Sequence, residues 1–474
     1  MKILLLKCGS GLKKGVITDF NSQTVYPPLG LLYIAAVLEN NGHQVEILDL
    51  FMEDLSSEQF TKTIASADAI GISVYMDNYR DVATISKIIK ETEPTIPIIL
   101  GGPHCIITKH RALNDIPQAD ISVISEGEQT IIEIVKYIQG KQKLSDIHGI
   151  LYKEKNTIKT GKPLRIIKDL DTLPVPARHL VEKYDYGNFP WGFKYRKKFT
   201  SIITSRGCPF SCRFCARYGN TIQGYAYRQR SAENVVKEIQ EIDQCYNSIM
   251  FVDDNFLADI RRAHKIFDML LETGIDSDLM IMGARVDTIN KELYTKMKKA
   301  GVKLIGYGIE SGNQDVLDYY NKKITLQQIR NAVNLAQKSG FKTFGTFIFG
   351  APIETTKHIE NTIKFAYSLK LDVALFGVLF YAMGSDLWKE AVQNDVISKD
   401  EYIVVANSQR NLGNFTLEEL YSYVRKANRS YYLRPTYIAT QLSRAILNGD
   451  INVLLNGMKF ITDLKKKNVD RSTS

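Results

Sequence analysis

Cysteine, tryptophan and long apolar runs are all scarce in this chain of 474 residues. The sequence holds 6 cysteines and 2 tryptophans. No apolar run reaches about 18 residues, so a membrane-spanning helix is not expected. The apolar part of Met1–Lys7 is too short for the hydrophobic region of a signal peptide and instead predicts a buried strand. These features exclude a small disulfide-stapled scaffold and favour a cytoplasmic protein.

The bulk composition is that of a large globular protein with a basic surface. Hydrophobic residues make up 44% and charged residues 24%, which is sufficient to bury more than one core. The length favours two to four domains. The net charge of +9 attracts anions in general but does not choose among them. The one dense basic run, Lys465–Lys467, is best interpreted as a solvated face, so no specific nucleic-acid site is predicted.

Three of the cysteines stand together in the run Arg206–Cys215, at the spacing C-x3-C-x2-C. Thiolates are the ligands of iron–sulfur clusters, and three of them can hold three irons of a cubane and leave the fourth iron open. A zinc site would need a fourth ligand, and no second C-x2-C or H-x3-H follows. Unrelated buried thiols are the remaining alternative. The spacing favours a cluster held by Cys208, Cys212 and Cys215.

The first 140 residues alternate short apolar runs with helical periodicity. Buried strands are predicted at Ile3–Leu6, Val45–Leu48, Ala69–Val74, Ile96–Leu100 and Ile121–Ile124, and helices at Leu29–Asn40, Tyr79–Glu91 and Thr130–Ile138. Repeated β-α units predict an α/β domain with a doubly wound parallel sheet of the Rossmann or flavodoxin type. Ligands of such sheets bind beyond the carboxyl ends of the strands.

Candidate ligand contacts lie in the loops at those strand ends. They are Pro28, Leu29, Ser73, Tyr75, Met76, Asn78, Gly101, Gly102, His104, Glu126 and Gly127. The glycines let a ligand approach the backbone closely. His104 can equally be a turn residue bonded to backbone groups, and Cys8 and Cys105 can be small hydrophobes packed near strand ends.

A second run of β-α units begins at Phe199, after a linker at 141–198. That linker contains a hairpin-like segment, Ile150–Ile158, and an extended run with two prolines, Leu170–Arg178. Residues 199–394 are predicted to form a partial (β/α)6 barrel, and residues 395–474 a helical domain. The barrel strands are expected at Thr200–Thr204, Ser248–Val252, Leu279–Met282, Leu304–Ile309, Thr343–Phe349 and Val373–Leu379. Helices are expected at Ala232–Tyr246, Arg262–Thr273, Lys291–Ala300, Leu326–Ser339, Thr356–Leu369, Leu417–Ser430, Pro435–Leu447 and Ile451–Leu464.

Polar and aromatic residues follow the barrel strands, where barrel chemistry is located. They are Asp253, Asp254, Asn255, Arg285, Glu310, Ser311 and Phe349, together with Phe214 in the cysteine run. Each has a structural alternative of its own. Asp253 or Asp254 could cap a helix, Arg285 could pair with Asp287, and Glu310 could satisfy a loop amide.

Together these motifs resemble the cobalamin-dependent radical S-adenosylmethionine (SAM) enzymes, over nearly the whole chain. The first half contains Pro-Pro-Leu-Gly-Leu, Gly-Ile-Ser-Val, Gly-Gly-Pro-His and Glu-Gly-Glu in the family's order. The second half contains the cysteine run with an aromatic residue, Phe214, before its last cysteine, and Gly308–Gly312 at the fourth strand. The run Arg429–Pro435 is similar to the tails of anaerobic bacteriochlorophyll cyclase-like and hopanoid methylase-like proteins.

The resemblance implies three cofactors, namely a [4Fe-4S] cluster, SAM and cobalamin. It places Asp253–Asn255 at the SAM amino group, Arg285 at its carboxylate, Glu310 and Ser311 at the ribose, and Phe349 over the adenine. The run Asp-x-His-x-x-Gly, whose histidine binds cobalt in other cobalamin domains, is missing from the sequence. The resemblance then implies that Tyr75 and Met76 lie near the lower corrin face.

The same resemblance implies reductive cleavage of SAM by the cluster and methyl transfer from methylcobalamin to an unactivated carbon. A radical rearrangement or oxidative cyclisation without methylation is the alternative. A tRNA methylthiotransferase ranks lower, because that class usually has three further cysteines in its N-terminal domain and this chain offers only Cys8 and Cys105. A cobalamin sensor or carrier would not need the cysteine loop. Expected partners are a small-molecule or lipid-like substrate and an electron donor of the flavodoxin or ferredoxin type, whereas a membrane-surface tail helix is less favoured.

The run Tyr227–Asn234 also resembles this family and leaves two roles open for its arginines. Arg228 and Arg230 could reach cobalamin or substrate anions, or they could form ion pairs that pack the domains. Ser231 is a predicted helix N-cap. Cys245, far from the cysteine run in sequence, is interpreted as structural.

Overall fold

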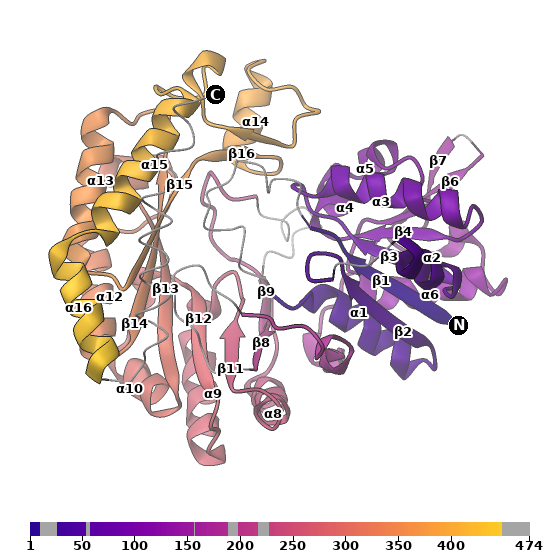
Figure 1. The fold of residues 1–474 in the computed structure, drawn as a ribbon, viewed down its shortest axis with the longest axis horizontal. Helices are drawn as coiled ribbons and strands as arrows, with labels where there is room; N and C mark the ends of the chain where they lie inside the picture. Colours follow the sequence, from indigo (N-terminus) through magenta and orange to yellow (C-terminus); the bar gives the residue numbers. More distant parts are fainter. Residues whose placement is uncertain (10–25, 54–56, 156, 188–197, 217–226, 448–474) are drawn as a thin grey trace. The chain divides into compact units, whose positions relative to one another are not determined.

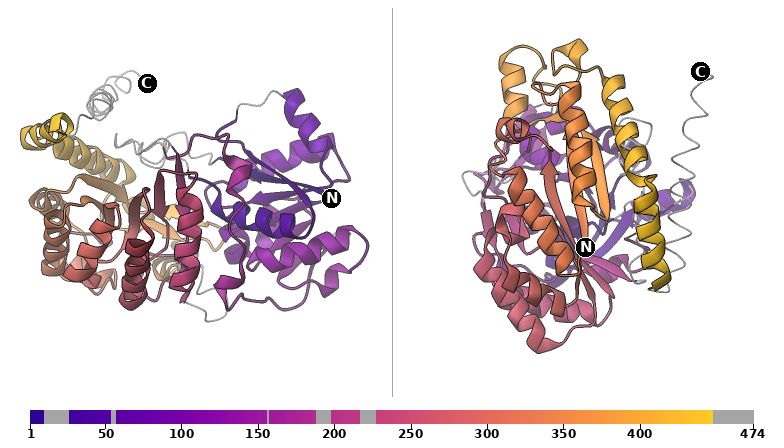
Figure 2. Two further views of the ribbon diagram at one scale, coloured as in Figure 1. Left: turned by 90° about the horizontal axis from the view of Figure 1, so that it is seen from below. Right: turned by 90° about the vertical axis from the view of Figure 1, so that its left-hand side faces the viewer.

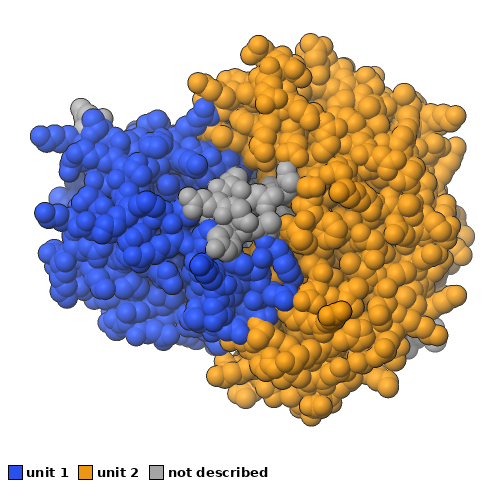
Figure 3. All heavy atoms as spheres, turned by 180° about the vertical axis from the view of Figure 1, so that it is seen from behind, with its two compact units in different colours: residues 1–17, 26–185, 218–230 blue, residues 18–25, 186–217, 231–474 orange. Residues whose placement is uncertain are grey.

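The computed structural model describes residues 1–9, 26–53, 57–155, 157–187, 198–216 and 227–447. The chain divides into two compact units, which are coloured separately in Figure 3. The first unit comprises residues 1–17, 26–185 and 218–230, and the second comprises residues 18–25, 186–217 and 231–474. The fold has the mixed α/β character that the sequence predicts.

The first unit is built on a seven-stranded sheet in the order β2-β1-β3-β4-β5-β6-β7. Its strands are β1 (Lys2–Lys7), β2 (Gln44–Asp49), β3 (Ala69–Ser73), β4 (Ile98–Gly101), β5 (Ile121–Val123), β6 (Ile150–Glu154) and β7 (Thr157–Thr160). Strands β1 to β5 pair in parallel, whereas β6 and β7 add an antiparallel hairpin at one edge. The strand order reverses between β1 and β3, which is where doubly wound sheets bind ligands.

Helices and short turns connect these strands. They are α1 (Leu29–Asn40), α2 (Ser57–Ala65), α3 (Tyr79–Thr92), α4 (Pro103–Thr108), α5 (His110–Asp115), α6 (Gly127–Ile138), η2 (Leu144–Asp146), η3 (Leu170–Thr172) and η4 (Arg178–Val181). The short strand β10 (Tyr227–Gln229) also belongs to this unit. The hairpin β6–β7 lies in the segment predicted as a linker, and its pairing with β5 makes it part of the sheet instead.

The core of the first unit packs apolar side chains from β1, β3 and β4 against the helices. Leu4, Leu6, Ile70, Ile72 and Ile98 are all at most 2% exposed. Their near-continuous apolar pattern is typical of parallel strands that are covered on both faces.

The second unit is a six-stranded parallel sheet in the order β15-β14-β13-β12-β11-β8, as the sequence predicts for a partial barrel. Its strands are β8 (Phe199–Ile202), β11 (Ser248–Phe251), β12 (Asp278–Ala284), β13 (Val302–Glu310), β14 (Lys342–Phe349) and β15 (Val373–Val378). The connecting helices lie along the outside of these strands, as Figures 1 and 2 show. Two edges, β8 and β15, end the sheet.

The remaining elements of the second unit are mostly the helices that the periodicity predicts. They are β9 (Ser205–Gly207), α8 (Ala232–Asp243), η5 (Phe256–Ala258), α9 (Ile260–Thr273), η6 (Val286–Thr288), α10 (Lys291–Lys299), α11 (Gln314–Tyr319), α12 (Leu326–Lys338), α13 (Thr356–Leu369), β16 (Phe380–Ala382), α14 (Asp386–Gln393), β17 (Ile403–Val405), η7 (Ser408–Arg410), α15 (Leu417–Tyr432) and α16 (Pro435–Leu447). Ser231 caps α8 through its side chain, which confirms the predicted cap.

The region from 395 onward is less uniformly helical than predicted. Strand β17 pairs antiparallel with β16 before α15 begins. The helix expected at Ile451–Leu464 lies outside the described residues. None of the helices in the described ranges is both long and apolar enough to span a bilayer.

Three tyrosines from α15 and α16 bond to the backbone beside edge strand β15. The Tyr432 hydroxyl accepts from Ala374 N at 3.1 Å and donates to Ala374 O at 2.8 Å. The Tyr431 and Tyr437 hydroxyls donate to Leu371 O and Asp372 O, at 2.6 and 2.7 Å. These bonds satisfy backbone groups that an edge strand otherwise leaves unpaired.

Candidate active site

The three cysteines of the C-x3-C-x2-C run lie in the loop after β9. Cys208 is half-buried, Cys212 is buried and Cys215 is exposed. Although part of the residue is exposed, desolvation of its thiol raises the pKa of Cys215 to about 12, with a further contribution from the Asp254 carboxylate. Desolvation likewise raises the pKa of Cys208. The thiols are within electrostatic reach of one another.

The cysteines are near neighbours but are not clustered as tightly as metal ligands. Within the described ranges, no three side chains of His, Cys, Asp or Glu lie close enough to form a metal site. Three soft donors on one short loop fit an iron–sulfur cluster better than any hard cation.

Glu310, at the end of β13, has an unusual backbone and a buried partner. Its φ of 68° lies in the left-handed region, at a register shift between β13 and β14. The carboxylate pairs with Lys322 at 2.8 Å and accepts from the Thr346 hydroxyl at 3.3 Å. A Cβ at Gly308 would lie 2.5 Å from Glu310 Oε1 and 2.9 Å from Lys322 Nζ, so a larger residue there would displace the Glu310–Lys322 pair.

Lys322 is a functional candidate that the sequence did not reveal. It is 8% exposed, and burial alone would lower its pKa, but the charges at Glu310 and Cys212 outweigh that effect and raise it. The ammonium therefore stays charged between the cysteine loop and the Glu310 carboxylate. The only sequence signal was a polar run, Tyr319–Lys323, shortly after Glu310.

The residues after β11 differ sharply in environment. Asp253 is buried, and its carboxylate accepts from Thr204 N, the Thr204 hydroxyl and the Ser205 hydroxyl. Asp254 is exposed. Asn255 is 1% exposed, and among the described residues neither polar atom of its side chain has a hydrogen-bond partner. An orphaned buried amide is suited to a polar ligand, because it otherwise incurs a desolvation penalty.

Arg285 and Phe349 are already engaged by neighbouring groups. Arg285 forms a bidentate pair with Asp287 at 2.9 and 3.0 Å, donates to Lys322 O at 2.7 Å and lies 3.7 Å from the Phe210 ring centroid. Phe349 is fully buried and stacks on Phe376, because alternation along β14 directs it into the core.

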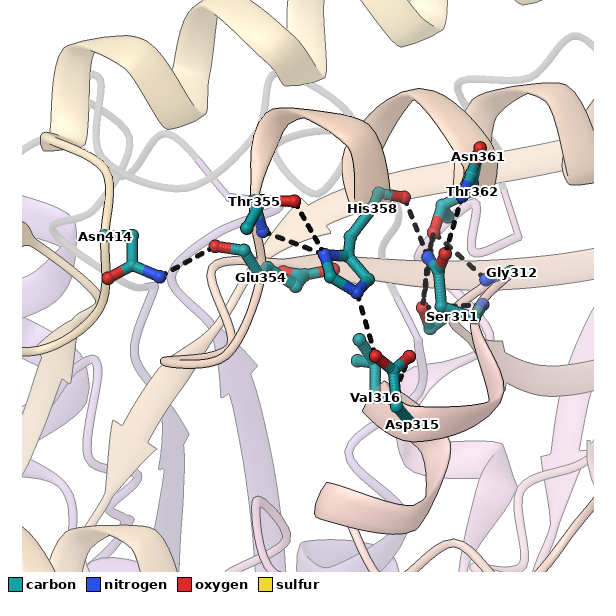
Figure 4. Close-up of polar contacts among 11 residues, drawn as sticks. Ser311, Gly312, Asp315, Val316, Glu354, Thr355, His358, Asn361, Thr362 and Asn414 are labelled. Carbon is teal, nitrogen blue, oxygen red and sulfur yellow. Dashed lines mark hydrogen bonds and ion pairs between the residues drawn. The ribbon is translucent and has the colours of Figure 1, made fainter.

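Ser311 belongs to a polar network that joins the end of β13 to α13 (Figure 4). Its hydroxyl contacts the Thr362 hydroxyl at 3.2 Å and accepts from Asn313 N. His358 bridges Thr355 and Asp315, with its Nε2 at 2.9 Å from the Asp315 carboxylate. This network fixes the loops around the strand ends.

In the first unit, the loops after β1 and β3 meet at the point where the strand order reverses. The Asn78 side chain accepts from Tyr75 N at 2.8 Å and donates to Cys8 O at 3.3 Å. Tyr75 is 49% exposed, whereas Met76 is buried. Ser73 ends β3, and Pro28 and Leu29 begin α1.

The loop after β4 is shaped by two glycines. Gly102 has a φ of 109°, and a Cβ there would lie 2.8 Å from Val74 O, whereas a Cβ at Gly101 would meet open space. His104, on the next turn, is fully buried, stacks on Tyr79 and lies 3.4 Å from the Asp115 carboxylate. His104 therefore lies within helix α4 and contacts side chains there, rather than occupying the turn that the sequence indicated.

Glu126, at the N-terminus of α6, is held by groups of the same unit. Its carboxylate makes a bidentate pair with Arg228, with both distances at 2.9 Å, and accepts from Ile167 N at 2.8 Å. Arg228 therefore forms an internal ion pair. Arg230 contacts the Tyr33 hydroxyl at 3.4 Å. A Cβ at Gly127 would lie 2.9 Å from Ile34, so this helix start packs closely on α1.

The chain matches two family models and several known proteins. The Radical SAM superfamily matches residues 202–366, and the B12 binding domain matches residues 15–135. A Pyrococcus horikoshii protein named as an uncharacterized methyltransferase is 33% identical, over 92% of this chain and 93% of its own. The anaerobic magnesium-protoporphyrin IX monomethyl ester cyclase of Rubrivivax gelatinosus is 28% identical, over 77% of this chain and 66% of its own.

A solved structure has the same fold. The radical SAM methyltransferase TsrM from Kitasatospora setae, with cobalamin and a [4Fe-4S] cluster bound, has a TM-score of 0.65 at 18% identity and covers 83% of this chain and 75% of its own. The chain belongs to the radical SAM enzymes that carry a B12-binding domain. The cofactors of this family are SAM, a [4Fe-4S] cluster and cobalamin, as the sequence predicts.

Proposed function

We propose that this enzyme transfers a methyl group to an unactivated carbon of a small molecule. The observation that supports this proposal is that the loop of Cys208, Cys212 and Cys215 is bonded to the segment Tyr319–Lys322, whose Lys322 pairs with Glu310 at the end of β13. When bound, the cluster and SAM supply a 5′-deoxyadenosyl radical, and cobalamin supplies the methyl group.

Different residues of the second unit would bind the cluster and the separate groups of SAM. The three cysteines would hold the cluster. Asp254 and Asn255 would receive the SAM ammonium, because one offers an exposed carboxylate and the other an unpartnered amide. Glu310, oriented by Lys322, would accept from the ribose hydroxyls.

The other predicted SAM residues would act through these contacts. Asp253 would fix the segment after β8 through its bond to Thr204, and Ser311 would fix the loop after Glu310. Phe349 would form the buried floor of the adenine side, and Phe214 would pack behind the cysteine loop. Arg285 would bind the SAM carboxylate only through guanidinium N–H groups that are not bonded to Asp287.

In the first unit, the loops after β1, β3, β4 and β5 would hold cobalamin. Tyr75 offers an accessible ring, and Gly101 leaves open space beside the backbone. Met76, Asn78, Gly102, His104, Glu126 and Gly127 would shape those loops from within, together with Pro28, Leu29 and Ser73. The proposed domains are a cobalamin domain at 1–140, a barrel at 199–394 and a helical domain at 395–474.

A ring-forming oxidation without methyl transfer is the second candidate, favoured by the likeness to the Rubrivivax gelatinosus cyclase. Both reactions need a small-molecule substrate and an external reductant. We propose that the substrate is bulky and lipid-like. We also propose an electron donor of the flavodoxin or ferredoxin type, because the family's cluster must be reduced one electron at a time.

The test uses protein purified without oxygen from cells supplied with B12. Wild-type protein given SAM and a reductant should release 5′-deoxyadenosine, and the variant with Cys208, Cys212 and Cys215 all changed to alanine should lose at least about 99% of that release. Cys245→Ala, which changes an exposed cysteine outside the loop, should keep it. Release that persists in the triple variant would refute the mechanism.

The mass of the product separates the two reactions. SAM with a deuterated methyl group and a small-molecule extract should yield a product that carries one labelled methyl. An unlabelled product that has lost hydrogen without gaining carbon would show the cyclisation instead.

A further inference from the structure

The end of α11 touches every residue that lies between the second and third cysteines. We use the name bracket for the four residues Tyr319–Lys322, which end this helix and follow it. The backbone N–H of Arg213 donates to Tyr320 O at 2.9 Å, and the Arg213 guanidinium donates to Tyr319 O at 3.1 Å. The last carbonyls of a helix lack partners within it, so these two donors complete α11.

Asn321 is the one side chain of the bracket that bonds to the loop backbone. Its Nδ2 donates to Ser211 O at 2.9 Å and contacts the Ser211 hydroxyl at 3.1 Å. Its φ of 52° lies in the left-handed region, which asparagine tolerates better than most residues. This backbone turns the amide away from the helix and onto the residue just before Cys212.

Aromatic contacts support the same loop as well. The Phe214 ring meets the Tyr320 ring edge-on, with centroids 5.0 Å apart. The Arg213 guanidinium lies 4.4 Å from the Tyr319 ring centroid. Phe214 immediately precedes Cys215, so hydrogen bonds and ring contacts fix the residues that flank both cysteines.

The far end of the bracket reaches the candidate SAM contacts. Lys322 pairs with Glu310 at 2.8 Å through its side chain, and its carbonyl accepts from Arg285 at 2.7 Å. One short segment therefore connects the cysteine loop to the carboxylate assigned to the ribose.

We propose that the bracket holds the cysteine loop in register with the SAM site and that Asn321 is its positioning residue. This inference rests on the proposed function. Asn321 does not touch a reacting atom. It acts by fixing Ser211, and through it the placement of Cys212 relative to Glu310.

The test compares two substitutions with a matched control in the full chain. Asn321→Gly keeps the left-handed backbone and removes the amide, and Asn321→Asp keeps the size but places a carboxylate oxygen against Ser211 O. Asn411→Gly changes another left-handed asparagine of the same unit, outside the bracket. Metal-free protein is followed by amide hydrogen exchange in peptides that cover residues 209–215.

Both Asn321 variants should exchange about fivefold faster in these peptides, as expected for the loss of one hydrogen bond. The control should match wild type. In anaerobically reconstituted protein, the electron paramagnetic resonance signal of the reduced cluster should respond to SAM at about tenfold higher SAM concentration in both variants. Unchanged exchange would overturn the bracket. Faster exchange with an unchanged SAM response would overturn the positioning role.

Failure of the proposed function has a different signature. Wild-type protein that binds no iron–sulfur cluster would refute that function and the positioning role with it, whatever the exchange data show. Equal exchange in wild type and variants, with a SAM-responsive cluster in both, would refute the bracket alone.

Discussion

Glu354 is a buried carboxyl group whose surroundings disfavour its charged form. It is 0% exposed, in the loop that follows β14. Its Oε2 accepts from Gly350 N at 2.6 Å and Ala351 N at 2.9 Å, whereas Oε1 has no partner among the described residues. Burial, only partly offset by these bonds, raises the pKa of Glu354 to about 7.

This pKa makes stability depend on pH in a defined direction. The folded protein holds the proton more tightly than the unfolded chain, in which the pKa is near 4.5. The resulting stabilisation is fully present below about pH 4.5 and is lost as the pH rises through 7, by about 3 kcal/mol in total. Glu354→Gln should remove this dependence, measured by chemical denaturation between pH 5 and 8.

The matched control is Glu360→Gln, which changes an exposed carboxylate on α13. Its slope of unfolding free energy against pH should equal that of wild type. If Glu354→Gln kept the wild-type slope, the carboxyl would be ionised throughout the range and its assigned environment would be wrong.

At the residue scale, the sequence predicted the three cysteines but not the residues that contact their loop. The spacing of Cys208, Cys212 and Cys215 is a local pattern, so it could be read directly. Asn321 and Ser211 are 110 positions apart, and their contact exists only because α11 returns to the loop. Lys322 was also missed. Its pairing with Glu310 depends on a left-handed turn, which no helical spacing in the sequence indicates.

At the scale of elements, the edge of the partial barrel is the distinctive feature. Tyr432 bonds to both polar groups of Ala374 on β15. Tyr432→Phe should lower the free energy of unfolding by about 1–3 kcal/mol, because it leaves a buried N–H and C=O of Ala374 without that partner. Denaturant unfolding of the second unit would measure the change.

Tyr423 provides the control on the same helix. Its hydroxyl contacts the Thr356 hydroxyl at 3.2 Å in an exposed position. Tyr423→Phe should therefore change the unfolding free energy by less than about 0.5 kcal/mol. Equal losses in the two variants would show that the bonds of the Tyr432 hydroxyl to β15 stabilise the protein no more than the exposed contact of Tyr423 does.

Elements with strong periodicity were predictable to the residue. The helices Leu29–Asn40 and Thr356–Leu369 have the predicted bounds because apolar residues recur along one face. Helices α4 and α5 were missed because Gly-Gly-Pro-His was read as a turn, and α2 because it is short and polar. The β6–β7 hairpin was visible, but its pairing with β5 is a long-range contact without a local signal.

At the scale of the whole molecule, two separate cores predict two unfolding steps. One core is confined to the first unit and the other to the second. Ile70→Ala should destabilise one calorimetric transition by about 2–5 kcal/mol and leave the other unchanged. Scanning calorimetry of the full chain, with cobalamin added or omitted, would show which transition belongs to the cobalamin unit.

Ile305→Ala is the reciprocal control, since Ile305 is fully buried in the core of the second unit. It should shift only the transition that Ile70→Ala leaves unchanged. A single transition that moves with both variants would show that the two units unfold as one cooperative body.

The discontinuity of the first unit has a consequence for biosynthesis. The ion pair between Glu126 and Arg228 joins residues 102 positions apart, and Arg228 follows the cysteine loop in the chain. A nascent polypeptide that stops at residue 185 therefore lacks strand β10 and the guanidinium that pairs with Glu126 in its own N-terminal unit. Completion of that unit must wait until the ribosome has already delivered all three cysteines.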